Sequence, residues 1–257
     1  MNKEWWQNID PKIHISLAEA RNESTLEEVN FIIEHCKCVP GKKILDLACG
    51  DGRHAKELAT RELTVYGLDY NYKLLEFGKK SEREVNFTQG NMLELPFGDG
   101  SFDIAISMWN SIGYFRDESD NEQVFSEVSR VLTPGGYLVL QVNNPYKLIL
   151  DIVSKSKIDE QGRSYLQTSE FIGQDKIKKI AVFNPKTSRY LSRRVNLDEK
   201  GNEVLFAEHD MRYYFPTELI GLLNDNQMET VSIYGSVDDR IYAIDSNDLI
   251  IVSRKKI

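Results

Sequence analysis

The stretch Lys43-Ile-Leu-Asp-Leu-Ala-Cys-Gly-Asp-Gly52 decides how the rest of this 257-residue chain is interpreted. Its first five residues are a short apolar run, which is typical of a buried strand. Small residues end the run, and a helical segment over residues 53–60 follows at once. Such residues allow a tight turn and a close approach of a ligand to the backbone. The opening turn of the helix then offers unpaired N–H groups to an anionic group.

An acidic residue completes this pattern. Asp69 follows the next apolar run and lies 19 residues after Gly50. Nucleotide-binding sheets place a carboxylate at about this spacing, where it accepts hydrogen bonds from the hydroxyls of a ribose. The alternative is that Asp69 caps the helix that follows it. Strand, glycine turn, helix, strand and acid together favour a nucleotide-type ligand.

Further motifs follow in a fixed order. They are Gly67-Leu-Asp-Tyr70, Gly90-Asn-Met-Leu-Glu-Leu-Pro96, Phe102-Asp-Ile-Ala-Ile106 and Arg130-Val-Leu-Thr-Pro-Gly-Gly136. With the opening stretch, they give roughly residues 40–143 a sequence that resembles the class I S-adenosylmethionine-dependent methyltransferases. Arg53-His54 and Ser111-Ile-Gly-Tyr-Phe115 are similar to segments of bacterial members that act on small molecules. The resemblance implies S-adenosyl-L-methionine as cofactor and S-adenosyl-L-homocysteine as product.

Alternation of apolar runs and helical patterns over residues 43–142 predicts a parallel sheet with helices on both faces. A helix over residues 146–154 and hairpin signals between residues 163 and 214 then predict a small antiparallel β insertion after the fifth strand. The hairpin signals are Gly173, Asn184-Pro185 and Glu199-Lys-Gly-Asn202. The whole is an α/β fold with a Rossmann-like, mostly parallel seven-stranded sheet. We expect its strands at 43–47, 63–69, 85–89, 102–108, 136–142, 229–235 and 248–254, and helices near 53–60, 73–81, 121–132 and after Pro216.

Four segments follow from these patterns. We expect an N-terminal helical cover over 1–40, a cofactor-binding core over 41–145, a lid or substrate insertion over 146–215, and a C-terminal helix with two strands over 216–257. Within the first segment, Ser24-Thr-Leu-Glu27 resembles a capping box. Trp5 and Trp6 have two interpretations: they cover the cofactor, as N-terminal helices do in the resembling enzymes, or they fasten a helix to the sheet.

Composition narrows the class of protein. A net charge of −8 weighs against a broad nucleic-acid-binding surface. Three cysteines, Cys36, Cys38 and Cys49, have no zinc-pair spacing and are typical of reduced thiols, which predicts a cytoplasmic protein without a metal. No run resembles a signal peptide or reaches membrane-spanning length. We therefore expect a soluble monomer or homodimer whose partner is a small-molecule or peptide acceptor, with no membrane partner, and the charge does not favour a nucleic-acid partner.

The resemblance also assigns cofactor-binding residues. Asp46 would order the loop or contact the methionine end, beside Ala48, where the family often has glycine, and Gly50. Asp69 would bind the ribose. Tyr70 would lie against adenine or pack at the sheet edge. Asn91 and Met92 would read the adenine edge, unless Asn91 is a plain turn residue. Arg53 and His54 would face the methionine end, unless His54 is a packed surface residue.

The segment after the fourth strand would receive the methyl acceptor. By resemblance, the Met108 carbonyl accepts from the cofactor's amino group. Trp109, Tyr114 and Phe115 would form an aromatic wall beside the sulfonium, or an ordinary apolar cluster, which we prefer for Phe115.

Methyl transfer is an in-line displacement that depends on alignment and exclusion of water. A base is needed only if the acceptor must lose a proton. His209, Tyr114 and Tyr213 are the candidate catalytic residues, and His14 and Tyr214 are further candidates. The acceptor atom is nitrogen or oxygen rather than carbon.

Other functions remain open from the sequence. A tRNA or protein methyltransferase would need a basic or grooved surface around the pocket. A nicotinamide-dependent oxidoreductase would use the strand, the glycines and Asp69, but it has no role for Asp46 or for Gly90-Asn-Met92. A methyltransferase-like fold kept for binding alone would take up the cofactor without turnover. Asn143-Asn-Pro-Tyr146 resembles a nucleobase-amine motif, but it follows the fifth strand instead of the fourth, and we reject it.

Overall fold

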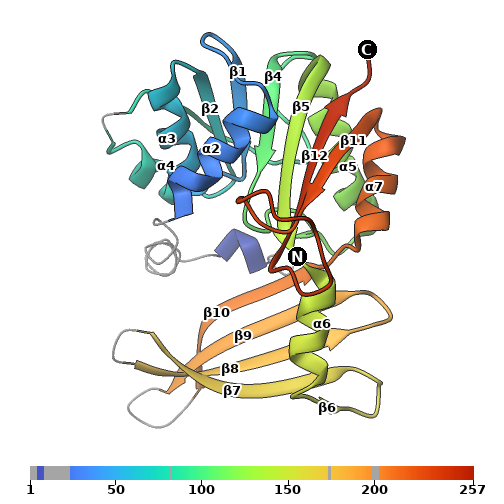
Figure 1. Cartoon of the computed structure of the whole chain (residues 1–257). Coiled ribbons are helices and arrows are strands. Elements are labelled where there is room, and N and C mark those ends of the chain that lie inside the picture. The colour runs from blue at the N-terminus through green and yellow to red at the C-terminus, as the bar shows by residue number, and fades with distance from the viewer. Residues whose placement is uncertain (1–4, 9–23, 82, 173–174, 198–202) are drawn as a thin grey trace.

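The computed structural model describes residues 5–8, 24–81, 83–172, 175–197 and 203–257. In Figure 1 a seven-stranded sheet with helices occupies the upper part of the molecule, and a five-stranded sheet lies below it. A short 3-10 helix, η1 (Trp5–Asn8), lies between the two. The chain thus forms two sheets that differ in strand number, and a common interior lies between them.

The upper sheet has the strand order β11-β12-β5-β4-β1-β2-β3. Strands β1 to β5 run parallel, and β12 runs antiparallel to both of its neighbours. The strand order reverses between β1 and β4, and such a reversal leaves a ligand crevice at the carboxyl ends of the strands. The predicted Rossmann-like sheet is confirmed. Its strands are β1 (Lys43–Leu47), β2 (Thr64–Asp69), β3 (Asn86–Gln89), β4 (Phe102–Ser107), β5 (Leu132–Asn143), β11 (Met228–Tyr234) and β12 (Asp248–Lys255).

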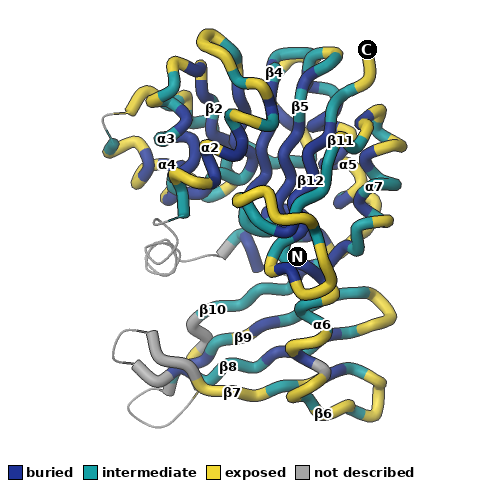
Figure 2. The backbone as a smooth tube through the Cα atoms, in the orientation of Figure 1, coloured by how far each residue is buried: buried dark blue, intermediate teal, exposed yellow. Residues whose placement is uncertain are grey.

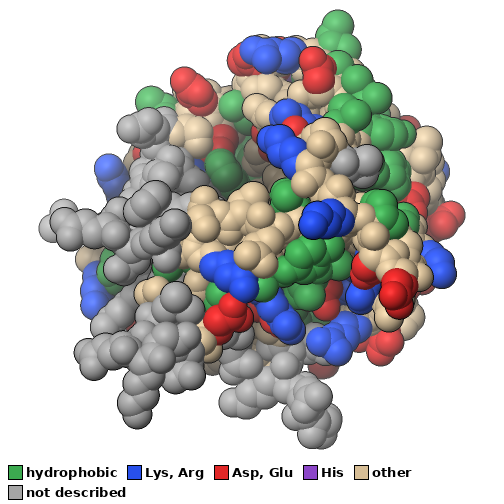
Figure 3. Space-filling model, turned by 90° about the horizontal axis from the view of Figure 1, so that it is seen from below, with side chains coloured by type: hydrophobic (Ala, Val, Ile, Leu, Met, Phe, Trp, Pro, Cys, Tyr) green, Lys and Arg blue, Asp and Glu red, His purple; other side chains and the backbone are tan. Residues whose placement is uncertain are grey.

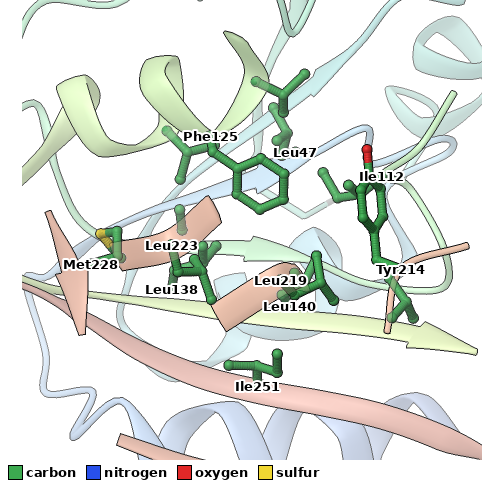
Figure 4. Close-up of a cluster of buried hydrophobic side chains, with 14 of the residues drawn as sticks. Leu47, Ile112, Phe125, Leu138, Leu140, Tyr214, Leu219, Leu223, Met228 and Ile251 are labelled. Atoms are coloured by element: carbon green, nitrogen blue, oxygen red, sulfur yellow. The ribbon is translucent and has the colours of Figure 1, made fainter. Parts of the chain in front are cut away.

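Helices cover both faces of this sheet because successive strand residues point to opposite sides. On β1, Ile44 packs with α2 (Thr25–His35) and α3 (Arg53–Leu58), and the neighbouring Leu45 belongs to the cluster on the other face. That second cluster contains side chains of α5 (Glu118–Val131) and α7 (Pro216–Asp225), among them Phe125, Leu219 and Leu223 in Figure 4. Figure 2 shows most of the backbone of β4, β5 and β12 as buried. The remaining helices of this part are η3 (Ala59–Arg61) and α4 (Tyr72–Gly78).

The lower sheet, named here the lid sheet, follows β5 through α6 (Pro145–Val153). Its strands pair only with their neighbours in the chain, in the order β10-β9-β8-β7-β6, and all pairs are antiparallel. The predicted antiparallel insertion is confirmed; the turn signals at Gly173 and at residues 199–202 lie outside the described residues. The strands are β6 (Lys157–Ile158), β7 (Ser164–Ile172), β8 (Asp175–Asn184), β9 (Arg189–Leu197) and β10 (Glu203–Arg212).

Backbone contacts join the lid sheet to the upper sheet. The Arg212 N–H donates to the Gly113 carbonyl at 2.7 Å. Gly113 has a φ of +90°, and a side chain there would clash with the Arg212 carbonyl oxygen. The Arg189 guanidinium also donates to the Phe115 carbonyl at 2.7 Å. The loop after β4 is therefore pressed directly against two lid strands.

Two local predictions are wrong. Ser24 makes no side-chain cap on α2, and its hydroxyl donates instead to Glu28 at 3.0 Å, so no capping box forms. Strand β5 begins at Leu132, earlier than residue 136, so Pro134-Gly135-Gly136 is an irregularity inside the strand. The β4–β5 register shifts beside it, between Phe102 and Ile104. Of the predicted N-terminal segment, Ile9, Ile13, His14, Ile15 and Leu17 lie outside the described residues.

Candidate active site

A cavity of about 770 Å³ lies between the carboxyl edge of the upper sheet and the lid sheet. Its walls come from the glycine loop, the segments after β2, β3 and β4, and one face of the lid sheet. The structure brings together twelve of the site residues that the sequence predicted, namely Asp46, Ala48, Gly50, Asp69, Tyr70, Asn91, Met92, Met108, Trp109, Tyr114, His209 and Tyr213. The further candidate Tyr214 does not line the cavity, and its hydroxyl donates to Glu118 at 2.8 Å. His14 lies outside the described residues.

The glycine loop after β1 owes its shape to left-handed backbone. Ala48, Gly50 and Gly52 have φ values of +55°, +59° and +76°. Glycine adopts this region freely, whereas alanine carries a cost of about 1 kcal/mol. Ala48 therefore holds a strained conformation that glycine would hold at less cost.

Asp69 is fixed by backbone donors. Its two carboxylate oxygens accept from the N–H groups of Gly50 at 2.8 Å and Asn71 at 2.7 Å. The helix that follows is capped by Asn71, which accepts from the Lys73 N–H, so the capping alternative for Asp69 is wrong. Burial raises the pKa of Asp69, and the backbone hydrogen bonds oppose that rise. Each oxygen has a second lone pair for a ligand hydroxyl.

Asp46 is the buried acid of the cavity. Its residue is 2% exposed, and its Oδ2 atom has no hydrogen-bond partner among the described residues. Burial raises the pKa of Asp46 to about 7, although the Arg53 guanidinium acts in the opposite direction. A buried carboxylate oxygen without a partner is costly unless a cation meets it. The site therefore fits the ammonium of an amino acid.

Sequence reasoning missed Glu28, on α2. Its carboxylate is 2% exposed and accepts from Arg53, His54 and the Trp109 indole N–H, each at 2.7 Å. Burial raises the pKa of Glu28, but the hydrogen bonds and charges of His54 and Arg53 together lower it by more. The net shift of the pKa is therefore downward. Burial lowers the pKa of His54. A signal existed: Glu28 stands one helical turn before Ile32, on the apolar stripe of a helix.

At the expected adenine end, some of the hydrogen-bonding groups predicted to bind the ligand already make contacts within the protein. The Asn91 side-chain oxygen accepts from the Leu93 N–H at 3.1 Å, the hydrogen bond of a turn. The Tyr70 ring packs edge-on against Trp6, with centroids 4.7 Å apart. Met92 packs against the core cluster. Turn and packing contributions are thus present at these positions besides any contact with a ligand.

The segment after β4 carries further strain. Trp109 and Asn110 have φ values of +58° and +61°, which is uncommon for two successive residues of these types. The Met108 carbonyl accepts from the Ser111 hydroxyl at 2.8 Å. The Trp109 ring lies under the Arg53 guanidinium, 5.1 Å from its centroid. This strained turn places the aromatic ring in the cavity wall.

Aromatic residues close the cavity opposite this turn. Trp5 packs edge-on against Tyr114 and His209, with centroids 4.8 and 5.2 Å apart. Phe115 is buried in the core cluster, as preferred, and also lines the cavity. Trp5 and Trp6 both line the cavity, so the N-terminal segment reaches this interior.

Tyr213 lies between the two sheets. Its hydroxyl accepts from the Asn143 side chain at 2.9 Å. Burial raises the pKa of Tyr213 to about 12. Near neutral pH the phenol is therefore protonated, and because Asn143 already donates to it, its own O–H points elsewhere.

The lid face is graded along the strands. Directly opposed residues on β8, β9 and β10 form three rows, set by the strand register. The rows change from aromatic and apolar, through hydroxyl and imidazole, to cationic. They are Phe183–Tyr190–Met211, Ala181–Ser192–His209 and Lys179–Arg194–Ala207.

Three findings bear on other kinds of site. Within the described part of the chain, no group of three or more His, Cys, Asp and Glu side chains is placed to hold a metal ion. Cys36, Cys38 and Cys49 are not in disulfides. No described helix is long and apolar enough to cross a membrane.

The fold itself is that of a Rossmann-like methyltransferase. CcbJ, a methyltransferase from Streptomyces caelestis, superposes with a TM-score of 0.76 at 20% identity, covering 91% of this chain and 90% of that one. An S-adenosylmethionine-dependent methyltransferase from Clostridium acetobutylicum gives 0.73 at 18% identity, with 90% and 92% covered. These likenesses concern the fold alone.

Sequence comparison gives the kind of domain. Residues 44–136 match the model of a methyltransferase domain family, so this part of the chain is a methyltransferase domain of the S-adenosylmethionine-dependent kind. The putative methyltransferase YqeM of Bacillus subtilis is 33% identical, over 54% of this chain and 57% of its own length. A demethylmenaquinone methyltransferase of Renibacterium salmoninarum is 30% identical, over 52% and 55%. The chain thus matches little more than half the length of these relatives. The match to this domain family implies S-adenosylmethionine as cofactor.

Proposed function

We propose that this protein transfers the methyl group of S-adenosylmethionine to nitrogen or oxygen of a small molecule or a peptide-like natural product. One observation carries the proposal: Asp46, Asp69 and the graded face of the lid sheet line one and the same cavity. A cofactor held by the two acids would thus share an interior with whatever the lid binds. In this proposal residues 146–215 are the lid, 41–145 and 216–257 form the cofactor-binding core, and 1–40 are a cover.

The residues present fit the cofactor. Asp46 offers an unpartnered carboxylate oxygen to its ammonium group, and Asp69 offers lone pairs to its ribose hydroxyls. Arg53 stands in the same wall with a charge suited to its carboxylate. Tyr70, Asn91 and Met92 line the part expected to take adenine. When bound, the group supplies an electrophilic methyl on a sulfonium.

The chain's own contribution to transfer is alignment and dryness. Trp5 closes the cavity against Tyr114 and His209, which restricts water around the acceptor. Tyr213 is protonated near neutral pH, so it donates a hydrogen bond to the acceptor and is not the base. His209 is the candidate base when the acceptor must lose a proton, because its imidazole lines the cavity and imidazole is the side chain that most often serves as a general base.

The lid face bears on the acceptor class. Its middle row carries Ser192, whose buried Oγ has no hydrogen-bond partner among the described residues, so an apolar acceptor would leave this hydroxyl without one. This favours a hydrogen-bonding acceptor. Among similar proteins, an amino pentose methyltransferase from Micromonospora echinaspora shares the fold, with a TM-score of 0.63 at 15% identity over 94% of this chain and 97% of that one.

The competing functions have less support. On the face seen from the lid side, Figure 3 shows Lys and Arg side chains interspersed with acidic and apolar ones, not the continuous basic surface that a tRNA enzyme needs. The methyltransferase family match leaves no support for a nicotinamide-dependent oxidoreductase. A binding protein without turnover is separated from an enzyme by assay alone.

Calorimetric titration with S-adenosylmethionine, S-adenosylhomocysteine and NADH tests the cofactor. We expect micromolar binding of both adenosyl ligands and none of NADH. Binding of NADH alone would overturn the proposal. With the cofactor secured, formation of S-adenosylhomocysteine is measured across matched amines, phenols and their methylated counterparts, and turnover of an amine or hydroxyl acceptor is the expected result.

A further inference from the structure

The part of the cavity formed by the glycine loop and the segments after β2, β3 and β4 is called the cofactor half. Glu28 connects two walls of this half, although it does not itself line the cavity. Its donors come from separate segments: Arg53 and His54 begin α3, after the glycine loop, and Trp109 follows β4. Ser24 donates to the same carboxylate. One buried acid on α2 therefore ties together the two loops that flank the crevice.

The charge states of Glu28 and His54 follow from the direction in which each pKa is shifted. The lowered pKa of Glu28 keeps its carboxylate ionised near neutral pH. The lowered pKa of His54 keeps the imidazole neutral, and its Nε2 must then donate, because an ionised carboxylate only accepts. Among the described side chains that donate to Glu28, Arg53 is the one permanent cation. A buried pair of this kind leaves an uncompensated charge when one member is removed.

Arg53 is held in one orientation by these contacts. Its Nη1 atom donates to Glu28 and to the Thr25 hydroxyl, both at 2.7 Å, and its guanidinium lies over the Trp109 ring. The charge of Arg53 also acts on Asp46: it lowers the pKa of Asp46, whereas burial raises it. A fixed cation beside a buried acid is complementary to a zwitterion, which is the charge state of an amino acid.

We propose that Glu28 is a positioning residue for the methionine end of the cofactor. It holds Arg53 and Trp109 so that Arg53 meets the cofactor's carboxylate while Asp46 meets its ammonium. This inference rests on the proposed function. It makes α2, which lies before the matched domain of residues 44–136, a working part of the cofactor site.

Binding of two ligands separates this role from a general structural one. S-adenosylhomocysteine and 5′-methylthioadenosine share the adenosine and sulfur, but only the first carries the amino acid end. In Glu28→Gln, affinity for S-adenosylhomocysteine falls about tenfold or more, because charge-assisted hydrogen bonds are lost. Affinity for 5′-methylthioadenosine stays within about twofold. Both are measured by calorimetry and need no acceptor.

The neighbouring Glu27 provides the matched control. It is exposed on the same helix, and Glu27→Gln leaves both affinities unchanged. Equal loss of both ligands in Glu28→Gln, or loss of neither, overturns the inference. If that variant does not fold, Trp109→Phe keeps a smaller aromatic ring and removes the N–H that donates to Glu28, and a smaller loss confined to S-adenosylhomocysteine is expected. Failure of the unaltered protein to bind S-adenosylhomocysteine would sink the proposed function instead.

Discussion

The two halves of the cavity hold their side chains by different means. In the cofactor half, the backbone does the holding: Asp69 accepts from the Gly50 and Asn71 N–H groups, and Ala48 sits in left-handed backbone. In the lid half, side chains simply alternate along antiparallel strands, and residues such as Ser192 and His209 meet in rows. A change in the first half disturbs the loop itself. A change in the second replaces one surface group and leaves the strands paired.

This difference predicts that cofactor binding and acceptor choice respond to separate substitutions. Asp69→Ala should have the largest effect, because it removes an acid that orders the glycine loop and that would bind the ribose in the proposed function. We expect affinity for S-adenosylhomocysteine to fall about 100-fold or more, from two or more charge-assisted hydrogen bonds. Calorimetry measures it, with Arg193→Gln on an exposed part of the lid as control. Unchanged binding in Asp69→Ala would contradict the backbone-held cofactor half.

Acidity sharpens the comparison at Asp46, whose pKa of about 7 results first from burial. An ammonium ligand favours the ionised form, so binding lowers this pKa, and the free protein must release a proton to bind below pH 7. Affinity for S-adenosylhomocysteine should therefore fall about tenfold between pH 8 and pH 6. Asp46→Asn should bind more weakly and lose this dependence, and an unaltered slope would exclude Asp46 as its source.

Without ligand, the same acid affects stability in a definite direction. The folded protein binds this proton more tightly than the unfolded chain does, since burial raises the pKa of Asp46 from 3.8. Its contribution to the free energy of unfolding therefore declines as the pH rises from about 4 to about 7.

Tyr213→Phe tests the lid half. Loss of one neutral hydrogen bond should reduce kcat/KM for a competent acceptor about fivefold. Affinity for S-adenosylhomocysteine should not change, since Tyr213 serves the other half. A fall in cofactor affinity of the same size would show that the halves are not independent. The pH profile is informative as well: because the phenol is a donor with a pKa of about 12, its removal should leave the profile near neutrality unaltered.

The smallest effect is expected at Ala48. Ala48→Gly relieves left-handed strain but adds flexibility to the unfolded chain, so the free energy of unfolding should rise by about 0.5 kcal/mol. The neighbouring Ala55 lies within α3, where Ala55→Gly should instead lower it by about 1 kcal/mol or more. Denaturant unfolding of both variants measures the contrast, and destabilisation by Ala48→Gly would refute the strain.

The two halves also differ in how far the sequence predicts them. Parallel strands are apolar runs that end in small residues and an acid, so the core and its acids, Asp46 and Asp69, were recognisable. Glu28 is marked in the sequence only by its place on the apolar stripe of α2. Its role is not predictable from there, because its partners Arg53 and Trp109 are distant in the chain and meet it only when α2 packs. The capping box failed for the same reason, since Ser24 hydrogen-bonds to Glu28.

In the lid, hairpin signals predicted the strands but not the rows. Which residues face each other depends on register, and a shift between Leu205 and Ala207 displaces β10 by one residue against β9. The sequence does not mark that shift. The catalytic roles of His209, Tyr114 and Tyr213 and the four segment boundaries stay predictions.

The position of β12 has a consequence for synthesis on the ribosome. The lid strands pair only with chain neighbours, so the whole meander can form as soon as β10 has emerged. Strand β5 emerges before all of them, yet its antiparallel partner β12 comes after α7 and β11. Until then the edge of β5 around Val139 and Leu140 is open, and open apolar edges recruit other strands. A nascent chain paused after the lid therefore presents an open apolar strand edge that is buried in the finished sheet.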